Sequence, residues 1–233
     1  RCDLGSHAPA GGIADPGRWP ALEAGARDDG ISYSAIMSAF QDTLQDGDTF
    51  VVEVGTISGL MSNIRLADGV TMISQTLWGS IGACTPMVLG VELANRGHAA
   101  GRTLLVTGDG AHLMTANEIG TFGRVGAKPI IVVINNGVYG VEEFLERNER
   151  RVYNELTGWE YAAAAKAMLG KAADDWLVEV VSTNGALVDA LDRARREDKA
   201  AYIEARMTEL LLDPMSTADL SIMYFDMAPP GSP

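Results

Sequence analysis

Three segments of the sequence place glycine or polar residues directly after short apolar runs. The segments are Gly55-Thr-Ile-Ser-Gly59, Gly108-Asp-Gly110 and Asn135-Asn136-Gly137. Glycine lets a backbone approach a ligand closely, and the hydroxyl groups of Thr56 and Ser58 can donate hydrogen bonds to it. Asp109 and Asn136 offer a carboxylate and an amide oxygen, which are the hard ligands that Mg²⁺ prefers. The three segments could therefore bind a phosphate group together with a divalent metal ion.

The segments contain no Lys or Arg. A diphosphate bound to them would have to be neutralised by a metal ion and by backbone N–H groups at a helix start. One carboxylate, one side-chain amide, a backbone carbonyl and two phosphate oxygens would make a plausible Mg²⁺ shell. Gly-Asp-Gly and Asn-Asn-Gly are also common turn sequences. The residues alone therefore leave two interpretations open, a metal and phosphate site or ordinary turns.

The elements that must position these segments follow from the apolar pattern. Short runs rich in β-branched residues predict buried strands at 49–54, 102–107, 129–134, 176–181 and 200–205. Helical spacing predicts helices at 31–44, 77–94, 115–125, 142–150, 160–169 and 185–196. Apolar strands that alternate with helices are typical of an α/β fold, a parallel sheet with helices on both faces in three layers. Ligands of such sheets bind at the carboxyl ends of the strands, where the three segments lie.

The rest of the chain is assigned by composition. Residues 1–30 are rich in Gly, Ala, Pro and Asp, which is typical of a linker or an N-terminal arm. Residues 31–210 are expected to form one domain, and residues 211–233, with several prolines, an irregular C-terminal tail.

Composition also limits the classes of partner and location. The 233 residues have a formal net charge of -13, which argues against nucleic acid or an anionic membrane surface as partner. No apolar stretch is long enough for a transmembrane helix, and the first residues lack the pattern of a secretory signal. Cys2 and Cys84 are too few for a disulfide framework. A cytoplasmic setting is therefore expected.

The segment from Gly108-Asp-Gly110 to Asn135-Asn136 resembles the signature of thiamine-diphosphate enzymes in both residues and separation. Gln75-Thr-Leu-Trp-Gly-Ser-Ile-Gly82 resembles the segment of pyruvate and indolepyruvate decarboxylases that wedges against the cofactor. Tyr153-Asn-Glu-Leu-Thr-Gly-Trp159 resembles a stretch that follows the metal loop in the same enzymes. The resemblance extends over residues 31–207 and corresponds to the C-terminal domain of those decarboxylases.

This resemblance implies that residues 31–210 bind thiamine diphosphate and Mg²⁺. Asp109 and Asn136 would bind Mg²⁺ through their side chains, and Val138 would bind it through its carbonyl. The other cofactor contacts that the resemblance implies are Gly55, Thr56, Gly108, Gly110, Ala111, Tyr139 and Val141. The family often has Ser where Ala111 stands, so only a backbone N–H would remain as a contact there.

Three further residues receive catalytic roles by the same resemblance. Ile81 would be the apolar wedge that bends the cofactor, and the Gly79 carbonyl would accept a hydrogen bond from its aminopyrimidine. Glu142 would be the carboxyl group over the thiazolium that handles protons. Without the resemblance, Ile81 would be a core residue and Glu142 part of a solvated helix start. His112 matches no catalytic position of the family, and a surface or loop position is expected for it.

The family carries a glutamate that activates the aminopyrimidine on a separate pyrimidine-binding domain. The present sequence has no second domain of that size, so the chain is expected to be inactive alone. The partner domain would come from a second chain in a hetero-oligomer such as a heterotetramer, or from the amino-terminal part of a longer chain. Together they would form a 2-oxo acid decarboxylase, which is a lyase, or an acyloin-forming carboligase.

Other functions remain as alternatives. The cofactor subunit of a 2-oxo acid oxidoreductase would normally work with iron–sulfur clusters, and the sequence lacks the necessary cysteines. A non-catalytic assembly subunit that keeps the fold is disfavoured because Asp109, Asn136, Ile81 and Glu142 are all present. A plain dinucleotide-binding domain is disfavoured because Gly108-Asp-Gly110 lacks the Gly-x-Gly-x-x-Gly spacing.

Overall fold

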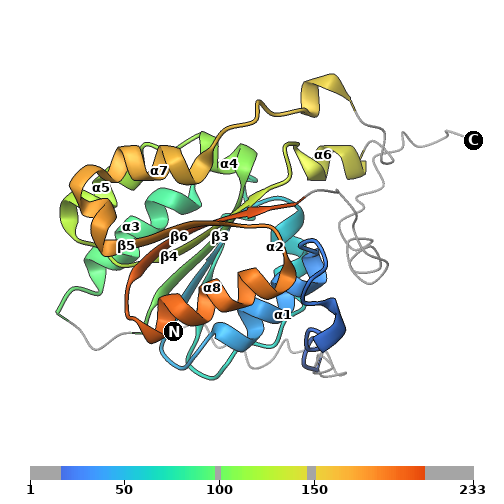
Figure 1. Ribbon diagram of the computed structural model, residues 1–233, viewed down its shortest axis with the longest axis horizontal. Helices are drawn as coiled ribbons and strands as arrows, with labels where there is room; N and C mark the ends of the chain where they lie inside the picture. Colours follow the sequence, from blue (N-terminus) through green and yellow to red (C-terminus); the bar gives the residue numbers. More distant parts are fainter. Residues whose placement is uncertain (1–16, 98–100, 146–150, 208–233) are drawn as a thin grey trace, which may run out of the picture.

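The computed structural model describes residues 17–97, 101–145 and 151–207. They form a parallel six-stranded sheet of order β2-β1-β3-β4-β6-β5, with helices on both faces (Figure 1). The strands are β1 (Thr49–Val52), β2 (Thr71–Ile73), β3 (Thr103–Gly108), β4 (Ile130–Asn135), β5 (Trp176–Val181) and β6 (Ala200–Arg206). The α-helices are α1 (Tyr33–Thr43), α2 (Thr56–Met61), α3 (Cys84–Ala94), α4 (Asp109–Leu113), α5 (Glu118–Val125), α6 (Gly140–Leu145), α7 (Tyr161–Leu169) and α8 (Asn184–Arg196). The predicted three-layer α/β fold is confirmed.

Successive side chains of the central strands enter two separate apolar cores. Phe50 and Val52 of β1 pack in the core that contains α1, α2 and α8, whereas Val51 packs in the core that contains α3, α5 and α7. Leu104 and Leu105 of β3 divide in the same way. Because both faces of the sheet are buried, its strands are apolar at nearly every position and show no polar alternation.

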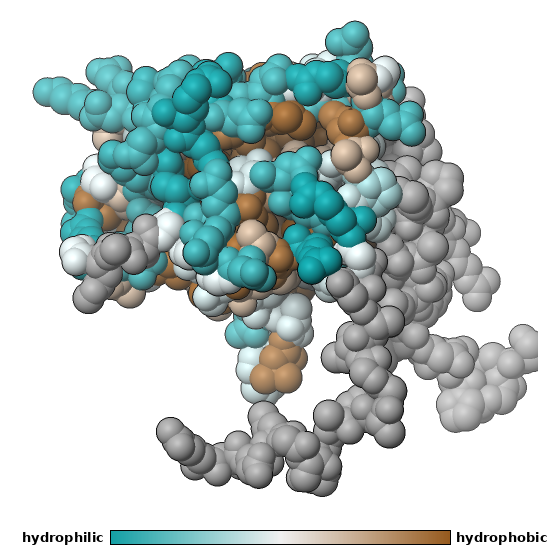
Figure 2. Space-filling view, turned by 90° about the horizontal axis from the view of Figure 1, so that it is seen from below, coloured by the Kyte–Doolittle hydropathy of each residue, from teal (hydrophilic) through white to brown (hydrophobic). Residues whose placement is uncertain are grey.

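Two helices on one face begin with side-chain caps. The Ser32 hydroxyl accepts a hydrogen bond from the Ala35 N–H at 3.1 Å, and the Thr183 hydroxyl accepts one from the Ala186 N–H at 3.2 Å. These residues start α1 and α8, which lie beside each other under the sheet (Figure 1). Seen from below, the molecule is largely hydrophilic, with hydrophobic groups showing between the polar ones (Figure 2). In the part of the chain that the structure describes, no helix is both long and apolar enough to cross a membrane.

Several predicted boundaries are wrong. The helix expected over 77–94 begins only at Cys84, because Gly79 and Gly82 adopt φ angles of 61° and 81° that break a helix. The helix expected over 115–125 begins at Glu118, and the short α4 before it was not predicted. The three-residue strand β2 was also missed. Of the helix expected over 142–150, residues 146–150 lie outside the described residues, and α6 begins two residues earlier, at Gly140.

The described part of the N-terminal arm is fastened to α1. The Trp19 N–H donates to the Gln41 side chain at 2.8 Å, and the Gln41 amide donates back to the Trp19 carbonyl at 3.0 Å. The Leu22 N–H donates to the Ser38 hydroxyl at 3.0 Å. Residues 17–30 are thus part of the folded body, while residues 1–16 and 208–233 lie outside the described residues. The three segment boundaries expected from composition stay predictions.

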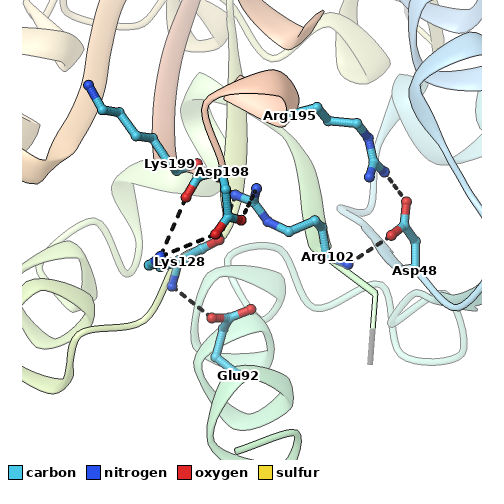
Figure 3. Close-up of polar contacts among 7 residues, drawn as sticks. All are labelled: Asp48, Glu92, Arg102, Lys128, Arg195, Asp198 and Lys199. Atoms are coloured by element: carbon cyan, nitrogen blue, oxygen red, sulfur yellow. Dashed lines mark hydrogen bonds and ion pairs between the residues drawn. The ribbon is translucent and has the colours of Figure 1, made fainter. Parts of the chain in front are cut away.

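A network of charged side chains lies at the amino-terminal end of the sheet (Figure 3). Asp48, directly before β1, pairs with Arg195 of α8 and accepts a hydrogen bond from the Arg102 N–H at 2.8 Å. The Arg102 guanidinium pairs with Asp198 at 3.1 Å, and Lys128 pairs with the same aspartate at 3.4 Å. Acidic and basic groups at this end therefore neutralise one another.

Candidate functional site

A pocket lies at the opposite, carboxyl-terminal end of β1, β3 and β4. Every predicted cofactor-binding residue except Gly79 contributes to its wall, together with Tyr33, Val54, Ile57 and Ile134. The structure therefore brings the three glycine-rich and polar segments together, as the parallel sheet predicts. The contacts of these residues with a cofactor stay predictions.

Asp109 joins two of the three segments. One carboxylate oxygen accepts a hydrogen bond from the Gly110 N–H at 2.9 Å, and the other accepts one from the Gly137 N–H at 2.7 Å. The side chain is only 1% exposed. Burial raises the pKa of Asp109 to about 6, although the hydrogen bonds from Gly137 and Gly110 lower it. Asp109 is thus a buried carboxyl group that holds neighbouring strand ends together without a basic side chain among the residues that line the pocket.

The Asn136 amide has a defined orientation. Its oxygen accepts a hydrogen bond from the Val138 N–H at 3.1 Å, and its nitrogen donates to the Tyr33 hydroxyl at 3.3 Å. Tyr33 is buried at the start of α1, and burial raises the pKa of its hydroxyl to about 12. No local pattern predicts this contact, since the two residues are 103 positions apart.

The backbone around the pocket leaves open space. Gly55 adopts a φ of 127° that side-chain-bearing residues rarely take. A Cβ added to Gly55, Gly108 or Gly137 would meet no other atom within 4 Å. Backbone N–H groups at the starts of α2 and α4 can donate hydrogen bonds there. The glycine-lined space and these donors fit a phosphate group.

At position 110, close packing of a neighbouring side chain requires a glycine. A Cβ at this position would lie 2.4 Å from Cε1 of Tyr139, so the tyrosine ring packs directly on the glycine. Tyr139 also lines the pocket. Tyr139 can therefore pack against Gly110 and still contact a cofactor in the pocket.

The donor set fits a metal ion only if the ligand supplies part of the coordination shell. In the described ranges, no group of three or more His, Cys, Asp or Glu side chains could hold a metal ion. Asp109 and Asn136 offer two side-chain oxygens at neighbouring strand ends. The bridge between Val138 and Glu155 uses the Tyr139 N–H and the Gly137 carbonyl, not the Val138 carbonyl. Mg²⁺ commonly completes such a set with phosphate oxygens and water.

The three predicted catalytic residues lie at different depths. Ile81 is on a loop rather than a helix, lines the pocket and is 39% exposed. Gly79 and Glu142 do not line the pocket, and Glu142 is exposed. Val141, directly before Glu142, does line it. The Glu142 carboxyl group is therefore close in sequence to the wall but is not part of it.

The surface or loop position expected for His112 is wrong, because the residue is buried in α4. The ring is fully buried, with Nε2 at 2.9 Å from the Tyr202 hydroxyl and Nδ1 at 3.3 Å from the Thr85 hydroxyl. Burial lowers the pKa of His112 to about 4, so the ring is neutral near pH 7. The residue connects α4 to β6 and α3. No local pattern could reveal this, because its partners are 90 and 27 positions away.

Comparison with known proteins adds independent information. The profile of a family described as thiamine pyrophosphate enzyme, C-terminal TPP binding domain, matches residues 53–205. The alpha-keto-acid decarboxylase of Mycobacterium avium (strain 104) is 35% identical over 199 residues, which are 85% of this chain and 34% of that protein. The alpha-keto-acid decarboxylase of Mycobacterium ulcerans (strain Agy99) is 33% identical over 204 residues, 87% of this chain and 35% of that protein. The chain thus spans about a third of the length of these relatives.

Proposed function

Because the chain belongs to the thiamine pyrophosphate enzymes, as their C-terminal cofactor-binding domain, we propose that it is the diphosphate- and Mg²⁺-binding part of a 2-oxo acid decarboxylase or acyloin-forming carboligase. The observation that supports this most is the buried Asp109, placed beside Asn136 in a pocket whose wall contains no basic side chain. A buried carboxylate without a counterion is unfavourable unless a cation joins it. Mg²⁺ would provide that cation and would also neutralise a diphosphate.

The proposed binding roles are those that the resemblance implies, and the position of these residues at the pocket supports them. Asp109 and Asn136 would bind Mg²⁺ through their side-chain oxygens, and Val138 would bind it through its carbonyl. Gly55 and Thr56 would donate to the diphosphate from the start of α2. Ala111 would do so from the start of α4, whereas Gly110, whose N–H donates to Asp109, would contact the diphosphate without donating to it. These N–H groups replace the Lys or Arg that many phosphate sites use.

Thiamine diphosphate, when bound, supplies the carbanion chemistry that cleaves the bond to a 2-oxo acid's carboxylate. The chain's own residues would orient it and control protons. Ile81, at the wall of the pocket, would press against the cofactor and keep it bent, and the Gly79 carbonyl would accept from its aminopyrimidine. Glu142, just outside the wall, would hold or release a proton at its carboxyl group near the substrate.

A partner domain is part of the proposal. The loop before α3 exposes two large side chains, Leu77 at 84% and Trp78 at 79%. Val152 and Tyr153, after α6, are exposed as well. Exposed apolar groups of this size often mark an interface. We expect a pyrimidine-binding domain with the activating glutamate to cover them, either from a second chain in a hetero-oligomer or from elsewhere in a longer chain.

Calorimetric titration of the full chain with thiamine diphosphate, with and without Mg²⁺, tests the proposal. We expect heat of binding only when Mg²⁺ is present. The titration is repeated with whatever chain co-purifies from the native source, and that complex is assayed for CO₂ release from 2-oxo acids. Absence of Mg²⁺-dependent binding both alone and in the complex would instead support a non-catalytic assembly subunit.

A further inference from the structure

Glu53 is another buried carboxyl group near this end of the sheet, outside the proposed binding and catalytic residues. It directly follows β1, and its own N–H donates to the Val106 carbonyl at 2.9 Å, which continues the pairing with β3. The side chain is 0% exposed. It does not line the pocket, although Val54 and Gly55, which follow it, do. Glu53 therefore directly precedes two residues of the pocket wall without being part of that wall.

The Glu53 carboxylate connects the end of β1 to the loop that holds Ile81. One oxygen accepts a hydrogen bond from the Val54 N–H at 3.0 Å, and the other accepts one from the Cys84 N–H at 3.3 Å. The Gly82 N–H also donates to this carboxyl group. In the described part of the chain no Lys or Arg forms an ion pair with Glu53. Its two oxygens thus accept from the backbone of Val54, at the end of β1, and from the backbone of the Gly82–Cys84 turn.

The turn at Gly82 to Cys84 is the fixed point of this loop. The Gly82 carbonyl accepts a hydrogen bond from the Thr115 hydroxyl at 2.7 Å. A Cβ on Gly82 would lie 2.5 Å from the Cβ of Met114, so the turn is pressed against the segment after α4. The preceding residues Leu77 and Trp78 are largely exposed. Ile81 therefore takes its position from the anchored turn and not from a helix.

We propose that Glu53 is a positioning residue that holds the Gly82–Cys84 turn, and with it Ile81, against the cofactor pocket. The effect on cofactor binding rests on the proposed function, whereas the effect on the turn does not. A carboxylate accepts at both oxygens, so it can serve N–H donors from two segments at once. An amide in its place would turn one acceptor into a donor and leave one of these N–H groups without its partner.

Hydrogen–deuterium exchange of the full chain tests the proposal directly. In Glu53→Gln we expect the Gly82 and Cys84 amides to exchange at least about tenfold faster than in the unchanged chain, because local opening exposes them. Asp48→Asn is the matched control, since Asp48 is also buried, also flanks β1 and also accepts backbone hydrogen bonds. It should change exchange near its own donors and leave Gly82 and Cys84 unaffected. Unchanged exchange of these two amides in Glu53→Gln would overturn the proposal.

A titration with thiamine diphosphate and Mg²⁺ gives the second readout. If the unchanged chain binds the cofactor, Glu53→Gln should raise the dissociation constant about tenfold, because loss of a supporting group typically has an effect of this size. The control Asp48→Asn should change the dissociation constant by less than about twofold. Faster exchange with unaltered binding would overturn the link between the turn and the cofactor. If the unchanged chain fails to bind, the proposed function fails, and the exchange result still decides what Glu53 does. Glu53→Asp, which keeps the charge but shortens the side chain, replaces Glu53→Gln if that variant does not fold.

Discussion

At the amino-terminal end of the sheet the buried carboxylate of Asp48 is paired with Arg195. At the carboxyl-terminal end Asp109 and Glu53 accept hydrogen bonds from backbone N–H groups and, among the described residues, pair with no Lys or Arg. All three carboxyl groups are at most 1% exposed. Removal of a charge from water is costly unless an opposite charge compensates for it. Asp48 therefore has a cationic partner, whereas Asp109 and Glu53 have none among the described residues. Arg206, at the end of β6, pairs with Glu204 instead.

If the proposed function holds, this difference separates an end of the sheet that stabilises the fold from an end that binds the cofactor. In the charged network of Figure 3, Asp48 and Asp198 each pair with a basic side chain, so these contacts can stabilise the fold without a ligand. The pocket end keeps Asp109 at a cost to the metal-free chain, as the raised pKa shows. A cation that binds there would offset this cost, and the gain would appear as affinity. The following predictions test this division.

The largest effect is expected on the free energy of unfolding, at the amino-terminal end of the sheet. Arg195→Ala would leave Asp48 buried without its cation, and loss of one partner of a buried pair typically costs about 3–5 kcal/mol. Urea denaturation of the metal-free chain measures the loss. Arg196→Ala, at an exposed neighbour on α8, is the control and should cost less than about 0.5 kcal/mol. A similarly small loss for Arg195→Ala would show that the network is not a stabilising one.

Asp109→Ala should weaken cofactor binding and leave the fold intact. Loss of a direct metal ligand should weaken Mg²⁺-dependent binding of thiamine diphosphate by at least about 100-fold, since loss of an outer-shell group already costs 10–100-fold. The fold should remain intact by circular dichroism. Asp48→Ala should unfold at lower urea concentration but bind as the unchanged chain does wherever it is folded. Equal effects of the two variants on binding would remove the distinction between the ends.

The pH dependence of stability offers a third test without any ligand. The pKa of Asp109 is raised from 3.8 to about 6 on folding, so its contribution to stability is present below about pH 4 and is lost as the pH rises through 6. Asp109→Asn does not undergo this loss. In the metal-free state it should therefore gain about 1–3 kcal/mol relative to the unchanged chain between pH 4 and pH 7. Urea denaturation at intervals across this range gives the difference.

Asp46→Asn, at an exposed aspartate in the turn before β1, is the control for that series. A difference between Asp109→Asn and the unchanged chain that is the same at every pH would contradict the prediction. Mg²⁺ and thiamine diphosphate added together should reverse the order of stability at pH 7, because only the carboxylate binds the metal ion strongly.

The sequence was sufficient for most of the sheet and for much of the pocket, for a physical reason. Buried parallel strands are apolar at nearly every position, so β1, β3 and β4 are visible as runs, and the residues after them meet at one edge. The loop before α3 was misassigned because Leu77, Ile81 and Cys84 have helical spacing. Two glycines with positive φ interrupt the helix there, and spacing alone does not report a backbone angle.

Contacts between segments that are distant in the chain could not be predicted from the sequence. Glu53 looked like one residue of an apolar strand, and nothing local connects it to Cys84, 31 positions later. The same holds for the Tyr33 hydroxyl and Asn136, because Tyr33 begins an ordinary amphipathic helix. Such contacts depend on how the layers pack, which the pattern of one element does not determine.

The smallest expected effect concerns the tyrosine that orients Asn136. Tyr33→Phe removes the hydroxyl that accepts from the Asn136 nitrogen at 3.3 Å. The Val138 N–H then remains as the contact that orients the amide, so its oxygen is presented to a metal ion less often. Mg²⁺-dependent binding of thiamine diphosphate should weaken about fivefold, equivalent to about 1 kcal/mol. Tyr161→Phe is the matched control, since Tyr161 is equally buried and its hydroxyl has no hydrogen-bond partner within the described ranges. Its affinity should stay unchanged, and an equal loss in both variants would mean that buried tyrosine hydroxyls, and not the orientation of Asn136, control binding at this end of the sheet.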